Sequence, residues 1–328
     1  MPFYRWPIWI ARLGTIIVLI IVIVTFTSLK PSIFPTSRNL LNILTQISLL
    51  GICAAGLTVC MITGEFDLSI GAIVTFGAVI SASLLSHFHP VLVILTVLFL
   101  TAGIGLVNGL IVTRLQVSSF MTTLGTMTML TGFNYWYTSG RGSILYSGIP
   151  AGFLKLGKGQ FWHIPYLVFF MLGVLLALHV ILRHTSIGRH MYAVGGNPEA
   201  AHFAGIPVRR LKILAFVISG FLAGLVGVLL VARLGLAEPT IGDRFLFDSF
   251  TVVFIGAASI NIGSFHILGT FIGALLVGTL FDGFTLLNVP YHLQLLVEGA
   301  ILIAAVTAAG LWEKLLPKKG LHKDQSGN

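Results

Sequence analysis

The chain has 328 residues, of which only 9% are charged and 56% are hydrophobic. Ordinary globular domains carry about 25% charged residues, so this composition excludes a water-soluble fold, and its high hydrophobicity excludes intrinsic disorder. The formal net charge is +9. Basic residues spread along a hydrophobic chain are typical of cytoplasmic loops rather than of a nucleic-acid-binding face. We therefore expect a polytopic membrane protein, surrounded by membrane lipid and without a nucleic-acid partner.

Apolar stretches long enough to cross a membrane recur along the whole chain. A spanning helix needs about 20 mostly apolar residues, and the helical pattern excludes a β-barrel. The first stretch is too long for a cleaved signal and predicts a retained anchor. We predict an all-α membrane helix bundle with about ten transmembrane helices. These spans are residues 13–29, 43–63, 68–86, 91–113, 118–138, 165–182, 212–232, 246–260, 266–287 and 292–310.

The distribution of basic residues predicts the orientation of these spans. With the N-terminus inside, twelve Lys and Arg residues fall on the inner side and seven on the outer side. Because cytoplasmic loops carry an excess of Lys and Arg, both termini are predicted to be cytoplasmic. The predicted parts are a cytoplasmic N-terminus at 1–12, a single transmembrane domain at 13–310 and a cytoplasmic basic tail at 311–328.

Two carboxylates lie between the second and third spans, in the segment GEFDLSIG at residues 64–71. Carboxylates near the bilayer are costly unless they reach water, helix caps or partners. Asp67 and Ser69 belong to the residue types that cap helix N-termini, which predicts a cap between two spans. The alternative is a broken helix that borders a pathway, since irregular backbone is tolerated in a membrane where it lines a cavity. The candidate residues of this helix-break motif are Gly64, Glu65, Asp67, Ser69 and Gly71.

The longest basic inner loop covers residues 183–212. Its Asn-Pro-Glu sequence at 197–199 is typical of a helix start, and Gly205 is typical of a helix end. These signals predict a short helix of about two turns that presents Ala201 and Phe203. Because so short a helix is unstable alone in water, it must dock either on the membrane face of the chain or on a cytoplasmic partner.

Glycines recur at helix-packing spacing in two of the later spans. Such small residues let helix backbones approach closely in lipid, so we predict packing seams, with a hinge in a transport cycle as the alternative. These glycines are Gly220, Gly224, Gly227, Gly269 and Gly273.

Polar and acidic side chains also fall within the predicted spans. Threonine hydroxyls often bond only their own helix backbone, whereas intramembrane acids are functional candidates by default. The acids lie in the outer part of their predicted helices, where they are expected to line an entrance for polyhydroxyl solutes or to meet an extracytoplasmic partner. The candidate translocation residues are Thr122, Thr126, Asn134, Asp248, Asp282 and Glu298.

Enzyme signatures are missing from the sequence. It contains no H-E-x-x-H, G-x-S-x-G or paired-cysteine metal motif. Residues 152–159 resemble a phosphate-binding loop but end in Gly159, where Ser or Thr should hold Mg²⁺. We therefore expect no catalytic residue, no metal site and no cofactor bound by this chain.

Residues 64–71 and the inner loop together resemble the ribose-type permeases of bacterial ABC importers. The first segment is similar to that family's G-[GE]-I-D-L-S-V-G sequence. The resemblance extends over roughly residues 40–308, but residues 256–265 lack several glycines of the family's glycine-rich turn. A turn with fewer glycines must be built differently, so no function of that turn is carried over. Further matching stretches are residues 186–189, 192–197, 200–201, 204–206, 219–220, 223–224, 232–234, 239–240 and 269–274.

The resemblance implies the permease subunit of an importer in the bacterial inner membrane. Its solute would be a monosaccharide or a related small polar molecule, including the furanosyl quorum signal. In that family two permease subunits, identical or different, form the pathway. A cytoplasmic ATPase binds ATP and Mg²⁺, and a periplasmic solute-binding protein delivers the solute. The residues similar to the family's ATPase-coupling loop are Gly195, Gly196, Asn197, Pro198, Ala200, Ala201, Ala204 and Gly205.

Two other classes of protein stay open on the sequence alone. One is an ion-coupled secondary transporter or channel for small polar solutes, in which Asp248, Asp282 or Glu298 carries protons. The other is an integral-membrane enzyme, although the sequence has no nucleophile and base at a readable spacing.

Overall fold

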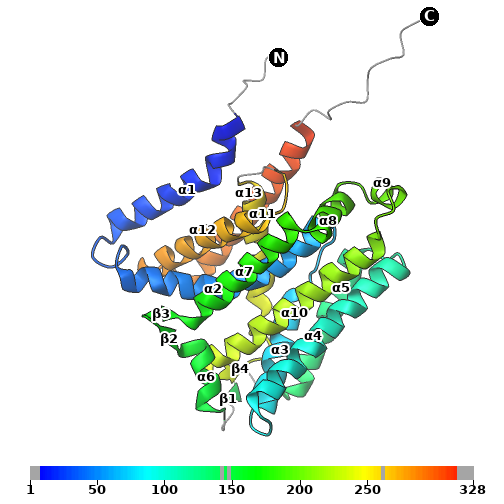
Figure 1. Ribbon diagram of the computed structural model, residues 1–328. Coiled ribbons are helices and arrows are strands. Elements are labelled where there is room, and N and C mark those ends of the chain that lie inside the picture. Colours follow the sequence, from blue (N-terminus) through cyan, green and yellow to red (C-terminus); the bar gives the residue numbers. More distant parts are fainter. Residues whose placement is uncertain (1–7, 141–143, 146–148, 260–262, 316–328) are drawn as a thin grey trace, which may run out of the picture.

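The computed structural model describes residues 8–140, 144–145, 149–259 and 263–315. Within these ranges it contains thirteen helices and four two-residue strands (Figure 1). Most of the predicted N-terminal segment at 1–12 and of the predicted tail at 311–328 lies outside the described residues. The same holds for residues 260–262 of the turn at 256–265.

Each of the ten predicted spans coincides with one helix, and the ends differ by at most six residues. Five of these helices, α2, α4, α7, α10 and α12, are long and apolar enough to cross a membrane by themselves. The ten helices are α1 (Ile8–Leu29), α2 (Ser37–Ile62), α3 (Ile70–Leu84), α4 (Pro90–Arg114), α5 (Ser119–Tyr137), α7 (Tyr166–His184), α10 (Val208–Leu234), α11 (Asp243–Ala257), α12 (Ile267–Leu286) and α13 (Tyr291–Leu315).

Three helices and two small strand pairs connect the long helices. Helices α8 (Ser186–Gly196) and α9 (Pro198–Phe203) lie at one end of the bundle, and α6 (Ala151–Lys158) lies at the other (Figure 1). Strand β1 (Ile144–Leu145) pairs with β4 (Leu236–Ala237), and β2 (Gln160–Phe161) pairs with β3 (Ile164–Pro165), both antiparallel. The strand pairs lie at the same end as α6.

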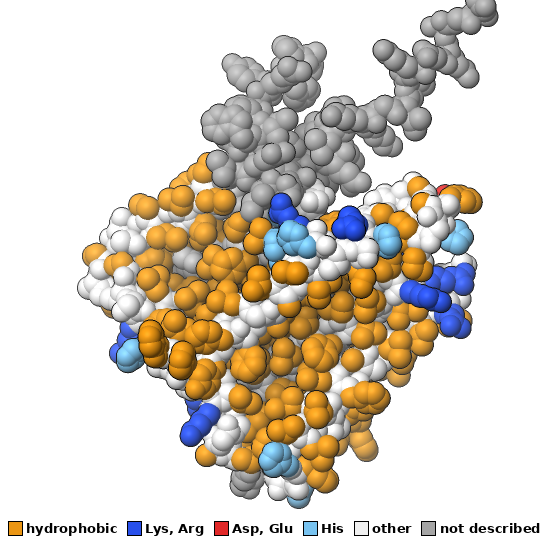
Figure 2. All heavy atoms as spheres, viewed as in Figure 1, with side chains coloured by type: hydrophobic (Ala, Val, Ile, Leu, Met, Phe, Trp, Pro, Cys, Tyr) orange, Lys and Arg blue, Asp and Glu red, His pale blue; other side chains and the backbone are white. Residues whose placement is uncertain are grey.

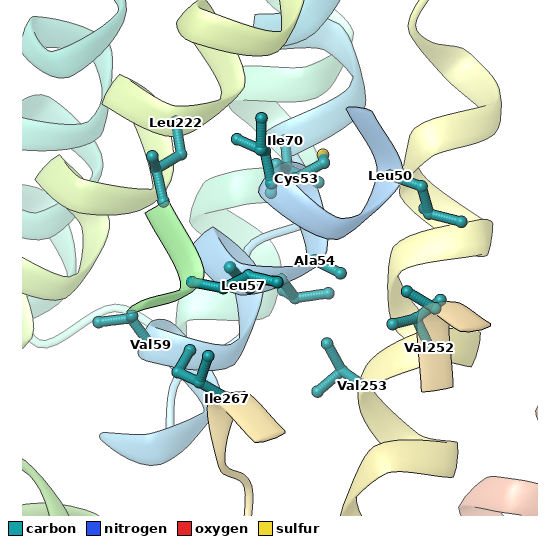
Figure 3. Close-up of a cluster of buried hydrophobic side chains, with 14 of the residues drawn as sticks. Leu50, Cys53, Ala54, Leu57, Val59, Ile70, Leu222, Val252, Val253 and Ile267 are labelled. Atoms are coloured by element: carbon teal, nitrogen blue, oxygen red, sulfur yellow. The ribbon is translucent and has the colours of Figure 1, made fainter. Parts of the chain in front are cut away.

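Helix α2 forms the centre of the bundle. It contacts α7, α10, α11 and α12, and both Cys53 and Cys60 on it are free and fully buried. Because lipid tails are as apolar as these side chains, close van der Waals packing rather than escape from water stabilises such a centre. The labelled side chains around α2 in Figure 3 come from α3, α10, α11 and α12 and include Ile70, Leu222, Val253 and Ile267.

The predicted glycine seams are confirmed as helix-packing contacts. A Cβ atom on Gly220 of α10 would overlap the carbonyl oxygen of Thr101 on α4, and one on Gly273 of α12 would overlap that of Val252 on α11. Gly224, Gly227 and Gly269 are equally close to neighbouring helices. These approaches allow α10 to pack directly on α3 and α4.

The outer surface of the bundle is mainly apolar. Figure 2 shows hydrophobic side chains over the middle of the molecule, whereas Lys, Arg and His side chains gather toward its two ends. Phe99 of α4, Leu176 of α7 and Ile303 of α13 are each at least 65% exposed. Large apolar side chains at this exposure suit contact with lipid rather than with water.

Candidate transport site

The chain reverses direction between α2 and α3 through an irregular segment, residues 63–69. Gly64 has a φ of +80°, and the amide groups of Gly64 and Glu65 donate to the carbonyl groups of Met61 and Cys60 at 3.1 Å each. This is a Schellman ending, which needs a left-handed residue and therefore favours glycine. The segment is thus a true helix break, and residues 65–69 need hydrogen-bond partners other than a helix ladder.

Asp67 is the buried centre of this break, and none of its surface is exposed. One carboxylate oxygen accepts from the Ser69 amide at 3.0 Å and from the Ser69 hydroxyl at 2.6 Å. The other oxygen accepts from the Ser219 hydroxyl of α10 at 2.7 Å. The prediction of a side-chain helix cap was wrong: Ser69 makes no capping bond to α3, because its hydroxyl donates to Asp67 and accepts from Asn108 instead of accepting from an amide of α3.

The network continues into α4 and α5. Asn108 of α4 donates to the Ser69 hydroxyl at 3.0 Å, and its amide oxygen accepts from Thr126 of α5 at 2.6 Å. The Leu68 amide donates to the Thr123 hydroxyl at 3.0 Å. Side chains of two helices thus satisfy groups that lack a helix or sheet partner, as buried polar groups require.

Glu65 links the break to the N-terminal end of α10. Its carboxylate forms an ion pair with the Lys212 ammonium group, and Glu65 itself is only 7% exposed. A cavity of about 590 Å³ opens beside this pair, lined by residues of the break and of α4 and α10. The negative charge of Glu65, which would be costly to bury alone, is therefore neutralised by Lys212, 147 residues away in the sequence.

The break also touches the inner loop directly. A Cβ atom on Gly195 of α8 would overlap the carbonyl oxygen of Ile62 at the end of α2, and the backbone of Gly195 lies against Gly64. By contrast, a Cβ atom on Gly196 would meet nothing within 4 Å. The two motifs that carried the family resemblance are thus in contact, a relation that their spacing along the chain could not reveal.

The predicted short helix exists as α9, and its predicted cap is confirmed. The Asn197 side chain accepts from the Ala200 amide at 2.9 Å, and Pro198 is the first helical residue. Phe203 is 82% exposed, as predicted, but the prediction that Ala201 is also presented was wrong, because Ala201 is 5% exposed and packs in the main core. In a two-turn helix, positions two apart face in different directions.

Helix α8 was missed by the sequence analysis. Three glycines at 188, 195 and 196 lower its helix propensity, which made residues 186–196 look like loop. One signal was available, because Thr185 caps the helix by accepting from the Gly188 amide at 3.4 Å. Two of the three glycines are required by packing: Gly188 lies against Leu182 and Gly195 against Ile62.

The structure divides the predicted translocation residues among separate places. Thr126 belongs to the network around Asp67. The Asn134 side chain donates to the Ala72 carbonyl group at 3.4 Å. Asp282 accepts from Asn39 at 2.8 Å, which ties the end of α12 to the start of α2. The buried Thr122 hydroxyl has no hydrogen-bond partner among the described residues.

Only Asp248 and Glu298 of the three acids lie together. They line one cavity of about 280 Å³ between α11 and α13, together with Arg244. Arg244 and Asp248 also line a second cavity of about 220 Å³ with Gln46 of α2. Arg244 lies over the Tyr291 ring at 5.2 Å. Sequence reasoning missed Arg244 and Gln46, although Arg244 precedes Asp248 by one helical turn.

Both clusters consist of hydrogen-bonding groups without a catalytic arrangement. The centre of the cluster at the break is fully buried at Asp67, Ser69 and Asn108, and the cluster joins four structural elements, so it suits the transmission of movement rather than contact with a solute. The cavity at Arg244, Asp248 and Glu298 has an almost wholly apolar exposed wall, and one oxygen each of Asp248 and Glu298 is buried without a hydrogen-bond partner among the described residues. A polar molecule that reached these two oxygens would supply the partner that they lack.

Comparison with known proteins shows that the chain is similar in sequence to transport permeases. Residues 39–306 match the family described as "Branched-chain amino acid transport system / permease component". The chain is 37% identical to a ribose import permease protein of Bacillus subtilis over 90% of this chain and 91% of that protein. It is 33% identical to a D-allose transport system permease protein of Escherichia coli, over 92% and 93% of the two chains.

A third relative is an L-arabinose ABC transporter permease protein of Azospirillum brasilense, 33% identical over 92% of this chain and 89% of that protein. No solved structure gives a significant match. The family match covers most of the chain, including the helix break, the inner loop and the two seams. The chain therefore belongs to this family of permease components, and it is a multi-pass inner-membrane transport subunit rather than an enzyme.

Proposed function

We propose that the chain is the transmembrane subunit of an ABC importer that moves a monosaccharide or a related polyhydroxyl solute into the bacterial cell. The observation that carries the proposal is the contact between α8 and the helix break, where Gly195 lies on the end of α2 and Lys212 pairs with Glu65. A push on α8 from a cytoplasmic ATPase would reach the buried Asp67 network through this contact. The names of the relatives support a sugar as solute.

We infer ten spans with both termini in the cytoplasm. In Figure 1 the first turn of α1 and the last turn of α13 lie at the same end of the bundle as α8 and α9. An even number of crossings agrees with that arrangement. The basic residues that border α8 and α9 support a cytoplasmic assignment for this end.

The partners follow from the two ends and the sides of the bundle. The ATPase, which would hold ATP and Mg²⁺, would bind the exposed residues of α8 and α9, including Phe203. A periplasmic solute-binding protein would bind at the opposite end, near α6. A second permease subunit, identical or different, would cover the exposed face of α5, where Gly125 and Gly132 have open space around them.

A Gly196→Trp variant tests the ATPase contact. Because a Cβ at Gly196 meets open space, the variant is expected to fold but to lose at least about tenfold in affinity for the ATPase, since a large ring blocks a close approach. Affinity is measured by pull-down with the purified ATPase, and ATP-driven sugar uptake is measured in proteoliposomes that also receive the binding protein. Gly152→Trp in α6 is the matched control, because Gly152 also has open space and lies at the opposite end.

Two results would contradict the proposal. Equal ATPase binding by Gly196→Trp and Gly152→Trp would remove α8 from the ATPase contact. Uptake that continues without ATP but stops with an uncoupler would favour an ion-coupled transporter instead. The uptake assay therefore separates the two classes without any variant.

We propose that the cavity at Arg244, Asp248 and Glu298 belongs to the solute pathway. Asp248→Asn and Glu298→Gln keep the side-chain volumes but remove the negative charge and replace one acceptor oxygen with a donating NH₂ group. Each is expected to lower sugar uptake by about tenfold, the effect of losing one hydrogen bond to a charged group. Asp282→Asn is the control, because Asp282 lies outside both cavities and binds Asn39. Equal loss in all three variants would contradict a specific role for this cavity.

A further inference from the structure

A basic pocket lies at the end of the bundle that carries α8, apart from the break and from the cavity at Asp248. It has a volume of about 430 Å³ and lies between the end of α7, the start of α8 and the start of α12. Figure 2 shows Lys, Arg and His side chains close together at this end of the molecule. The pocket is lined by His179, Leu182, Arg183, Arg189, Tyr192, Ser264, His266, Ile267 and Leu268.

The positive charge of this basic pocket is not neutralised by the part of the chain that the structure describes. None of its nine lining residues is acidic. The ion pair that the described residues form is between Lys212 and Glu65, so neither Arg183 nor Arg189 has a salt-bridge partner among them. Two arginines that face one hollow without an acid repel each other, and an anion between them removes that repulsion.

The start of α12 adds backbone donors to the same pocket. His266 is the N-cap residue of this 20-residue helix, and its side chain makes no capping bond. The first amide groups of the helix, at Ile267 and Leu268, therefore lack an intrahelical partner and lie at the positive end of the helix dipole. Burial, followed by the charges of His179 and Arg183, lowers the pKa of the His266 imidazole below its ordinary value.

The outward face of α7 that leads to Arg183 is apolar. Leu172, Leu176 and Val180 of α7 are exposed, and they follow one another at helical spacing toward Arg183. Tyr192 closes the opposite side by donating from its hydroxyl to the Phe265 carbonyl group at 3.1 Å. An apolar stripe that leads to two arginines matches an acyl chain below a charged headgroup.

We propose that this basic pocket binds a phosphate group at the cytoplasmic surface, and that anionic phospholipids of the surrounding leaflet supply it. Arg183 and Arg189 hold the phosphate oxygens, the first amide groups of α12 add donors, and the stripe on α7 receives an acyl chain. Because the bound lipid contacts α7, α8 and α12, it stabilises the position of α8 against the bundle. A free phosphate anion has the same chemistry and is the other source.

The test measures lipid binding to the purified full-length chain in an uncharged detergent. Dioctanoyl phosphatidylglycerol is compared with dioctanoyl phosphatidylcholine, and inorganic phosphate is added separately, with binding measured by titration calorimetry. We expect the anionic lipid to bind at least about tenfold more tightly than the zwitterionic one, since both arginines attract an anionic headgroup. Tighter binding of inorganic phosphate than of the anionic lipid would assign the site to the free anion.

Variants connect the binding to this pocket. Arg183→Gln with Arg189→Gln is expected to remove the preference for the anionic lipid. Arg209→Gln with Arg210→Gln removes the same charge from the same end of the bundle, outside the pocket. This double variant is expected to keep the preference for the anionic lipid. Thermal unfolding without lipid checks that both double variants fold, and the wild-type comparison of the two lipids needs no variant.

Three outcomes would overturn the proposal. One is equal binding of the two lipids by the wild-type chain, with no binding of inorganic phosphate. Another is unchanged lipid preference in Arg183→Gln with Arg189→Gln. The third is loss of ATPase binding by this variant with unchanged lipid binding, which would assign the arginines to the contact with the ATPase. The first two outcomes leave the proposed transport function untouched, so the two proposals fail separately.

Discussion

Asp67→Ala is expected to lower the free energy of unfolding by about 3–5 kcal/mol and to abolish transport. The carboxylate accepts three hydrogen bonds, from the amide and hydroxyl groups of Ser69 and from the Ser219 hydroxyl. Alanine would leave these donors buried without a partner, and each such group costs about 1–3 kcal/mol. The effect is measured as the shift of the thermal unfolding midpoint of the purified protein in detergent.

Two variants show whether the loss comes from the hydrogen bonds. Ser219→Ala removes one donor together with its bond and is expected to cost only about 1 kcal/mol. Asp243→Ala removes an exposed carboxylate from the first turn of α11 and is expected to cost less than about 1 kcal/mol. If Asp67→Ala unfolds no earlier than Asp243→Ala, the helix break does not depend on this network.

Gly105→Ala is expected to cost at least about 3 kcal/mol, because it separates the two most extensively packed helices. A Cβ atom at Gly105 of α4 would overlap the backbone carbonyl group of Phe216 on α10. The neighbour is backbone, so the overlap is relieved only when the helices move apart, and overpacking of this kind costs about 1–3 kcal/mol or more. The measurement is thermal unfolding, together with the yield of monodisperse protein in size-exclusion chromatography.

Gly103→Ala is the matched control on the same helix. A Cβ atom at Gly103 would meet nothing within 4 Å. Alanine is a better helix former than glycine by about 1 kcal/mol, so this variant is expected to be neutral or slightly stabilising. Equal behaviour of the two variants would mean that α4 and α10 do not need this close approach.

Local signals were sufficient for the features that depend on a short stretch of chain. The cap at Asn197 and the glycine seam on α10 both follow from the chemistry of a few adjacent residues. The same signals failed at Ser69, since its hydroxyl had a choice between capping α3 and binding Asp67. They also failed at α8, where glycines that packing requires concealed the helix.

Side-chain partners across the bundle could not be read from the sequence. Glu65 and Lys212 are 147 residues apart, and nothing local to either residue indicates the other. The three outer acids looked equivalent, yet Asp282 binds Asn39 whereas Asp248 and Glu298 share a cavity. A helix that is apolar on all sides has no distinct buried face. Its hydrophobic pattern therefore does not predict which helices it contacts or which side faces them.

The sequence by itself determined that this is a membrane protein, where each of its ten long helices lies, and which family it resembles. The first two properties follow from the length of apolar runs, since a bilayer requires about 20 apolar residues per crossing. The family resemblance follows instead from the residues at 64–71 and in the inner loop. Only the tertiary structure decided which polar groups meet, how α8 touches the helix break and where a basic pocket opens. These contacts depend on the close packing of helix backbones, which is a property of the whole bundle rather than of any single segment.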